Sequence, residues 1–370
     1  MRHIYLDYNT TTPLAPEVQE AMVPFLAEFY GVPGGAHWLA RASAEAIEDA
    51  RSKLATLLGA AREDLVFTSG GSESVNLAIK GTVLRQRPVA AHLVITAADH
   101  NCVADTARFL ESWGCEISIA PVTGQGVVTA AAIESLLRPE TVLVSVPHVA
   151  GDSGVIQPIR SIAEVCHRNE IPLHVDACQS AGKMPVLVDE LEADMVSVSG
   201  HKMYAPKGVG LLWVRPGLAL EPLVHGSGHE AGLRGGTQNI AGIVGLGRAA
   251  TLVRETLDDQ TPHVAKLRER LHAGLSATLG QPLTVYGERV LRLPNTLCVC
   301  FPDIAADDLL QRAGEVCASP AGSSGLLTAQ GVSAREARGA VRFSVGRYTT
   351  AEEIDRAVAI LSTTWESLRA

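Results

Sequence analysis

The stretch PLHVDA (172–177) decides the fold, because it is an apolar run that ends in a carboxylate. An amphipathic segment, IRSIAEVCHRNE (159–170), precedes it, and a second apolar run, DMVSVSG (194–200), follows it. Further apolar runs stand at 64–70, 92–98, 141–147 and 210–214. Apolar strands that alternate with helices are typical of a mostly parallel sheet with helices on both faces. The sequence therefore predicts an α/β fold.

The pattern changes after about residue 245. It then consists of a long helical stretch, two short strands and a final helix, at 247–279, 293–301, 339–346 and from Ala351. Short strands between helices predict a smaller α+β unit. We therefore predict a large α/β domain over residues 16–245, and a small α+β domain formed by residues 1–15 and 246–370.

The composition excludes several classes of protein. The chain has 370 residues, of which 46% are hydrophobic and 19% charged, so it can bury a large core and is not a disordered protein. Its 31 Lys and Arg residues stand against 40 Asp and Glu residues, whereas binding to nucleic acid needs clustered cations. No apolar run reaches the roughly 18 residues of a membrane span, and residues 1–13 lack the apolar stretch of a signal peptide. We expect a cytoplasmic protein that binds neither nucleic acid directly nor a membrane.

The numbers of cysteines and lysines limit the kinds of site that this chain can form. The seven cysteines have no regular spacing, which argues against a disulfide framework, and no cysteines or histidines stand at the spacing of a zinc site. We therefore predict no metal site. An enzyme with a lysine nucleophile would have few candidates here, since only six of the 31 basic residues are lysines. They are Lys53, Lys80, Lys183, Lys202, Lys207 and Lys266.

Polar motifs follow several of the predicted strands. The motif TSGGSES (68–74) joins a strand to a helical run, and its small residues would let backbone N–H groups hold a phosphate. The alternative is a tight turn with a serine cap. A strand also ends at Asp176, whose buried carboxylate needs a partner such as a cationic heterocycle nitrogen. The alternative there is an aspartate that caps the following helix.

A third motif, SVSGHKMYAPKG (197–208), is a polar loop after a strand. A lysine beside the end of a buried sheet is explained by a role as a Schiff-base nucleophile, which favours Lys202. Lys183, which follows a glycine after a short loop, is the competing choice. A phosphate cradle, a buried aspartate and a loop lysine together describe a pyridoxal phosphate site.

These motifs resemble those of the cysteine desulfurases of the NifS/IscS type, nearly from end to end. The resemblance rests on YLDYNTTTP (5–13), TSGGSES (68–74), VITAADH (94–100), GVIQP (154–158), HVDACQ (174–179), SGHKMYAPKGVG (199–210), RGGTQN (234–239), LPNTL (293–297) and VRFSVGR (341–347). It implies the aspartate-aminotransferase-like fold (fold type I), pyridoxal 5'-phosphate as cofactor and L-cysteine as substrate.

The resemblance also implies how the cofactor phosphate is held. Gly71 and Ser72 would bind it on one side, and Ser199 and His201 on the other. Thr237 resembles the family residue that reaches the phosphate across a subunit interface, so the active unit would be a homodimer.

Other residues are implied to contact the cofactor ring. Lys202 would carry the cofactor aldehyde, Asp176 would pair with the ring nitrogen, and Gln179 would reach the ring hydroxyl. His100 would stack on the ring and move protons. The alternative for His100 is a capped loop histidine.

For the substrate carboxylate the resemblance indicates Arg342, with Asn9 as a second substrate-binding residue. Arg347 is the competing arginine. The sequence departs from the family at Ala150 and Gly151, which replace a pair of asparagines, so one polar contact to the cofactor is expected to be lost.

The largest departure concerns the mobile-loop cysteine that accepts sulfur in the family. Its expected position is occupied by Gly322, and the nearest thiol is Cys317. We favour Cys317 as the nucleophile, because five extended residues span roughly 17 Å. In the alternative, Cys317 is a structural thiol. Cys102 is a weaker candidate nucleophile, and Cys178 is expected to be a small buried hydrophobic residue.

The predicted reaction is therefore conversion of L-cysteine to L-alanine, with a persulfide formed on Cys317 and passed to a sulfur acceptor protein. That acceptor would belong to iron–sulfur assembly, tRNA thiolation or DNA phosphorothioation. Among these pathways, the unusual loop and the excess of Arg over Lys favour DNA phosphorothioation, which is served by the DndA type of desulfurase. The alternatives are a pyridoxal-phosphate C–S lyase (cysteine or cystine lyase) without a protein persulfide, and a non-catalytic scaffold of a sulfur pathway.

Overall fold

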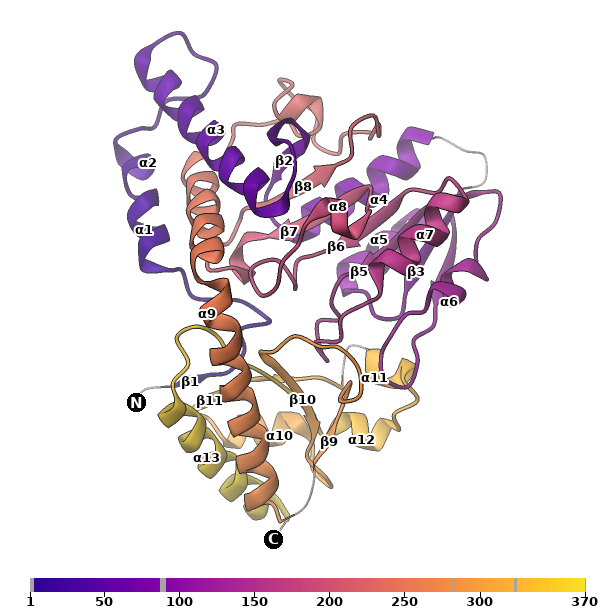
Figure 1. Ribbon diagram of the computed structural model, residues 1–370, viewed down its shortest axis with the longest axis vertical. Helices are drawn as coiled ribbons and strands as arrows, with labels where there is room; N and C mark the ends of the chain where they lie inside the picture. The colour runs from indigo at the N-terminus through magenta and orange to yellow at the C-terminus, as the bar shows by residue number, and fades with distance from the viewer. Residues whose placement is uncertain (1–2, 87–90, 281–282, 323–324, 370) are drawn as a thin grey trace.

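The computed structural model describes residues 3–86, 91–280, 283–322 and 325–369, and Figure 1 shows an upper and a lower part. The described residues of the upper part form a seven-stranded sheet in the order β2-β8-β7-β6-β5-β3-β4. Its strands are β2 (Leu65–Thr68), β3 (His92–Thr96), β4 (Glu116–Ala120), β5 (Thr141–Pro147), β6 (Leu173–Asp176), β7 (Met195–Ser199) and β8 (Gly210–Val214). The pairings from β7 to β4 are parallel, whereas β8 is antiparallel to β7 and β2. This sheet agrees with the predicted α/β class.

Helices cover both faces of the large sheet. The helices of the upper part that precede α9 are α1 (Pro16–Met22), α2 (Pro24–Ala27), α3 (Trp38–Leu58), α4 (Gly71–Gln86), α5 (Asn101–Glu111), α6 (Ala130–Glu134), α7 (Ile159–Arg168) and α8 (Val188–Leu191). Leu93 packs in a buried apolar cluster with α4 and α5, while its neighbour Val94 packs in another with α3 and α7. Successive strand side chains point to opposite faces, so both faces of the sheet are buried.

The lower part is built on an antiparallel sheet with the order β12-β13-β10-β9. The elements here are β1 (Ile4–Tyr5), β9 (Thr284–Val285), β10 (Thr296–Cys300), α10 (Ala306–Arg312), β11 (Val316–Cys317), β12 (Ser319–Pro320), α11 (Leu326–Ala329), α12 (Ala334–Arg338), β13 (Ala340–Ser344) and α13 (Ala351–Arg369). Strand β1 pairs with β11, and Ile4 and Leu6 lie in one buried cluster with Phe301 and Phe343. The N-terminal segment therefore packs with the C-terminal part of the chain.

Helix α9 (Ile240–Thr278) runs through both parts, as Figure 1 shows in orange. Its first half, up to Val253, packs in the cluster beneath the large sheet, and its second half, from Val264, packs in the lower cluster. The predicted boundary between residues 245 and 246 lies inside this helix. The division into two domains at that point stays a prediction.

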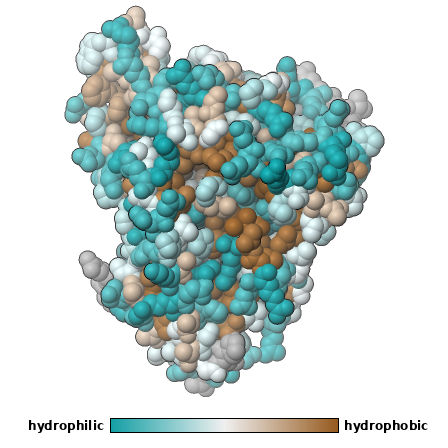
Figure 2. Space-filling model, viewed as in Figure 1, coloured by the Kyte–Doolittle hydropathy of each residue, from teal (hydrophilic) through white to brown (hydrophobic). Residues whose placement is uncertain are grey.

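The surface seen in Figure 2 is mostly hydrophilic, with hydrophobic side chains gathered at mid-height, where the upper and lower parts meet. Among the described residues, no helix combines the length and apolar character needed to cross a membrane.

Candidate active site

A cavity of about 760 Å³ lies where the carboxyl ends of the parallel strands face the lower part. Pro147, Asp176 and Ser199, the last residues of β5, β6 and β7, line it together with Leu326 and Arg342 from the lower part. Ligands bind at this end of the strands in open α/β sheets. The predicted site residues that line this cavity are Asn9, Gly71, Ser72, His100, Asp176, Gln179, Ser199, His201, Lys202 and Arg342.

The predicted phosphate cradle forms the start of α4. A Cβ atom on Gly71 would lie 2.5 Å from Sγ of Cys178 and 3.1 Å from Cβ of Ser199, so glycine is needed for this close approach. Oε2 of Glu73 accepts a 2.8 Å hydrogen bond from the Ser69 N–H and so shapes the loop before the helix. N–H groups at a helix start attract anions. The cradle therefore fits a phosphate group.

Asp176 is buried at the end of β6. Its Oδ1 accepts a 2.9 Å hydrogen bond from the Cys178 N–H, which is the local capping contact of the alternative interpretation. A carboxylate has a second oxygen, and Asp176 also lines the cavity. The residue can therefore cap the turn and still receive a cation such as a protonated ring nitrogen.

Lys202 lies in a short 3-10 turn directly after β7. Beside it, Nδ1 of His201 lies 3.0 Å from Oγ1 of Thr11. Burial, reinforced by the charge of Lys202, lowers the pKa of His201 to about 4, so its imidazole is neutral at pH 7. Tyr204 adopts a left-handed backbone conformation, φ 66°, and its N–H donates to Oγ1 of Thr12 at 2.8 Å. These contacts hold the lysine-bearing turn against the N-terminal segment.

His100 is the N-cap of α5, and its Nδ1 accepts a 3.1 Å hydrogen bond from the Cys102 N–H. A neutral imidazole that accepts at Nδ1 carries its proton on Nε2. Burial, and then the nearby charge of Lys202, lowers the pKa of His100. The capping contact and the position in the cavity coexist, because they use different atoms of the ring.

Arg342 in β13 is held by two carboxylates. Its Nη2 donates to Oδ1 of Asp7 at 2.9 Å, and its Nη1 donates to Oδ1 of Asp152 at 3.3 Å. The same Asp7 oxygen accepts from the hydroxyls of Thr10 and Ser319, at 3.0 and 2.9 Å. A bidentate substrate carboxylate at this guanidinium would have to displace one of these partners.

Besides Lys183, three predicted or competing residues do not line the large cavity in the described part of the chain. Arg347 places its guanidinium 5.5 Å from the ring centroid of Tyr204. Thr237 is exposed in the segment before α9. Cys317 lies half-buried in β11, where it pairs with Tyr5. Of the predicted catalytic groups, only the thiol of Cys317 thus stands outside this cavity.

The thiols that do line it are Cys102 and Cys178. Burial raises the pKa of Cys102 to about 12 and also raises the pKa of Cys178, so both remain protonated and poorly nucleophilic at neutral pH. At Gly322, a Cβ atom would lie 2.1 Å from the carbonyl oxygen of Ala337. In this conformation, the position where the family has its loop cysteine cannot hold a side chain.

Two amide side chains lie against the backbone at the departure from the family at Ala150 and Gly151. Nδ2 of Asn9 donates to the carbonyl oxygen of Gly151 at 3.3 Å. A Cβ atom on Gly151 would lie 3.5 Å from Nε2 of Gln179, so the Gln179 amide lies against this backbone.

Sequence reasoning missed two buried charged groups. Lys183, considered there only as a competitor of Lys202, is buried beside the cavity. Glu230 forms a buried ion pair of 2.9 Å with Arg51, which is 179 residues away. No local pattern marks Glu230, whereas the four-residue spacing from Gln179 to Lys183 was a usable signal.

The sequence profile of the family described as Aminotransferase class-V matches residues 4–357. The chain belongs to this family. A curated relative of this chain, the cysteine desulfurase IscS of Dictyoglomus turgidum, is 37% identical over 378 residues, with 100% of this chain and 96% of the relative covered. The solved structure of a NifS-like protein has a TM-score of 0.92 at 36% identity and covers 99% of both chains.

A third similar protein is SspA, whose structure in complex with cysteine has a TM-score of 0.79 at 34% identity and covers 94% of this chain and 99% of that one. Together these matches confirm the predicted resemblance to NifS/IscS proteins and the predicted fold of this chain.

Proposed function

We propose how this chain, which is a pyridoxal-phosphate-dependent cysteine desulfurase, uses its residues to convert L-cysteine to L-alanine. The observation that carries the proposal is that Lys202, Asp176 and His100 line one cavity together with the start of α4. These groups come from different loops, so their meeting at the carboxyl ends of the strands is a property of the fold.

The N–H groups of Gly71 and Ser72 and the side chains of Ser199 and His201 would hold the cofactor phosphate. The glycine cradle and the neutral His201, which can donate a hydrogen bond, support this assignment. Asp176 pairs with the protonated ring nitrogen. Bound in this way, pyridoxal phosphate supplies an electron sink for negative charge at the substrate Cα.

Lys202 would hold the cofactor through its aldehyde, and its amine would move the α-proton of the substrate. His100 assists, because its neutral ring carries a proton on Nε2 and so can pass one within the cavity. Arg342 binds the substrate carboxylate with help from Asn9, and Gln179 donates to the ring oxygen. Each of these five residues lines the same cavity.

Cys317 receives the sulfur. Its thiolate attacks the sulfur of cysteine, the C–S bond breaks, and an S–S bond forms. The proton lost by the Cys317 thiol ends on the methyl group of alanine. The segment that carries Cys317 is joined to the cavity, because Ser319 bonds Asp7 and Asp7 bonds Arg342. Strands β11 and β12 are only two residues long, so few ladder hydrogen bonds oppose a movement of this segment.

The proposed active unit is a homodimer in the cytoplasm, in which Thr237 reaches the phosphate bound by the other subunit. Its exposure and its position outside its own cavity support this role. Nε of Arg234, in the same segment, donates to Glu73 at 3.0 Å and so ties the segment to the phosphate cradle. The seven free cysteines agree with a reducing compartment. The persulfide passes to a sulfur acceptor protein, of iron–sulfur assembly, tRNA thiolation or DNA phosphorothioation.

The test compares Cys317→Ser with the matched control Cys102→Ser in the cofactor-loaded enzyme. We expect Cys317→Ser to lose both alanine formation and protein-bound sulfane sulfur, and the control to keep both. A C–S lyase would instead release sulfide unchanged in Cys317→Ser. Lys202→Ala should lose the covalently fixed cofactor after borohydride reduction, and retention of it would overturn the assignment of Lys202.

A further inference from the structure

Lys183 is the only one of the six lysines that is buried, with 8% of its surface exposed. Among the described residues, it forms no ion pair with a carboxylate. Burial lowers the pKa of Lys183 well below its ordinary value, and the charges of Lys202 and Arg342 act in the same direction. Burying an amine costs free energy, which indicates that a hydrogen-bond donor is needed at this position.

The partners of Lys183 are two side-chain amide oxygens. Its Nζ donates to Oε1 of Gln179 at 2.7 Å and to Oδ1 of Asn9 at 2.9 Å. An amide side chain has one accepting end and one donating end. By occupying the oxygens, Lys183 turns the NH₂ groups of both amides away from itself.

The donating ends of these amides point to defined partners. Nε2 of Gln179 donates one hydrogen to the backbone oxygen of Asn9 at 2.8 Å. Nδ2 of Asn9 donates to Oγ1 of Thr296 at 2.9 Å. The side-chain oxygen of Asn9, Oδ1, also accepts from Nδ2 of Asn295 at 3.1 Å. Gln179 therefore keeps one N–H, and its side chain lines the large cavity.

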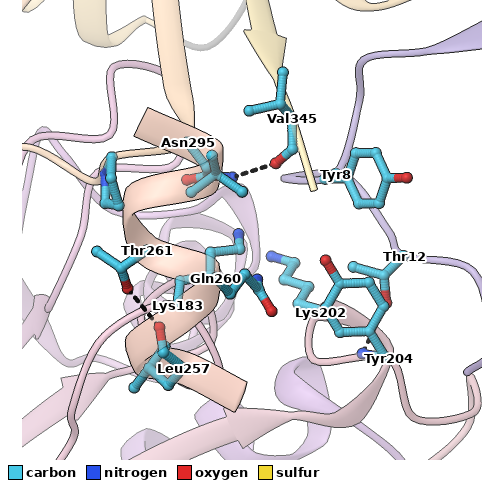
Figure 3. Close-up of a pocket in the computed structure, with 12 residues that line it drawn as sticks. Tyr8, Thr12, Lys183, Lys202, Tyr204, Leu257, Gln260, Thr261, Asn295 and Val345 are labelled. Atoms are coloured by element: carbon cyan, nitrogen blue, oxygen red, sulfur yellow. Dashed lines mark hydrogen bonds between the residues drawn. The ribbon is translucent and has the colours of Figure 1, made fainter. Parts of the chain in front are cut away.

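Figure 3 shows Lys183 and Lys202 approaching each other from two elements, with Asn295 above them. Both lysines line the narrow cavity drawn there, but only Lys202 also lines the large one. Lys183 thus lies behind Gln179 as seen from the large cavity, and it acts through that amide.

We propose that Lys183 is a positioning residue that fixes the Gln179 amide with its N–H facing the cofactor ring oxygen. The inference rests on the proposed function, in which Gln179 contacts that oxygen. An anionic ring oxygen is stabilised by an N–H donor and repelled by a carbonyl oxygen. Without Lys183 the amide can rotate by half a turn and present the wrong end.

The test uses the holoenzyme and two substitutions. Lys183→Met removes the donor at similar size, while Lys183→Gln keeps a donor without an ammonium group. The exposed Lys266→Met is the matched control. The first readout is the pH midpoint of the visible absorbance of bound pyridoxal phosphate, and the second is its dissociation constant.

We expect Lys183→Met to raise the midpoint by about half a pH unit or more and to weaken cofactor binding by about tenfold. The midpoint rises because a ring oxygen without its donor holds the shared proton more strongly. Lys183→Gln should stay near the wild type. In a Gln179→Leu background, Lys183→Met should have no further effect on the midpoint.

An unchanged midpoint in Lys183→Met, or equal shifts in the Met and Gln variants, would overturn the inference. Should Lys183→Met fail to fold, Lys183→Leu, which also removes the donor, takes its place in both backgrounds, because an equal shift with and without Gln179 excludes action through that amide. Failure of the proposed function looks different, since the wild-type protein would then bind no pyridoxal phosphate or form no alanine.

Discussion

Nη1 of Arg342 lies 3.3 Å from Oδ1 of Asp152, and both side chains line the catalytic cavity. The other carboxylate on this guanidinium, Asp7, does not line the cavity and is held by two hydroxyl groups as well. Asp152 is therefore the partner that a substrate carboxylate displaces most easily. If Arg342 binds the substrate carboxylate as proposed, Asp152 competes with the substrate for this guanidinium in the free enzyme.

Asp152→Asn should lower the KM for L-cysteine by about threefold to tenfold, because the substrate no longer competes with a negative charge. We expect kcat to change little, since Asp152 takes no part in proton transfer. Steady-state formation of alanine measures both constants. Arg342→Lys is the control and should raise KM, as lysine cannot bind a carboxylate bidentately. A higher KM in Asp152→Asn would show that this aspartate helps to hold the substrate.

Gly322→Cys, which places a thiol where the family has one, should destabilise the protein by about 1–3 kcal/mol. The reason is the 2.1 Å separation between the added Cβ and the Ala337 carbonyl oxygen, which forces a backbone shift. The exposed Ala329→Cys is the control and should change stability by no more than about 0.5 kcal/mol. Urea denaturation compares the three proteins, and equal midpoints would mean that the loop has another conformation in solution.

Acid should weaken the fold through His174, which is fully buried between Oγ of Ser145 and Oγ of Ser197, each at 2.8 Å. Burial lowers its pKa to about 4, below the value of about 6.5 in the unfolded chain. The unfolded state thus binds the proton first, and the stability from this residue, complete above about pH 6.5, falls as the pH drops toward 4.

The slope from one such histidine reaches about 1.4 kcal/mol per pH unit, and His148, whose pKa burial also lowers to about 4, adds a similar contribution. His174→Gln removes one titrating group, so its unfolding free energy should fall less steeply between pH 6.5 and 5. Denaturation at several pH values measures this. A slope identical to that of the wild type would mean that His174 has the same pKa in the folded and the unfolded chain.

The strands of the large sheet were predictable where both faces are buried. The apolar runs at 64–70 and 141–147 appear as β2 and β5. Strand β4 was not predicted, because it lies at the edge of the sheet and its sequence, with Glu116 and Ile119 exposed, lacks a continuous apolar run. Solvent on one side of a strand weakens the pattern that marks it.

The position of residues at the cavity was predictable where one loop carries them, as for Lys202 and His201, which both line it. Long-range pairs were not, and Asp152 with Arg342, 190 residues apart, is an example. The burial of Lys183 also depends on Asn9, which lies in the N-terminal segment, far from Lys183 in the sequence. A motif places residues on a loop, whereas packing decides what stands behind them.

Helix α9 gives the whole enzyme a mechanical property. Its 39 residues supply apolar side chains to the clusters above and below the active site, with Val253 in one and Val264 in the other. Unfolding of either cluster would loosen α9, which also packs in the other cluster. The two parts should therefore unfold together on heating. Neither part could be exchanged with that of a relative without its own stretch of α9.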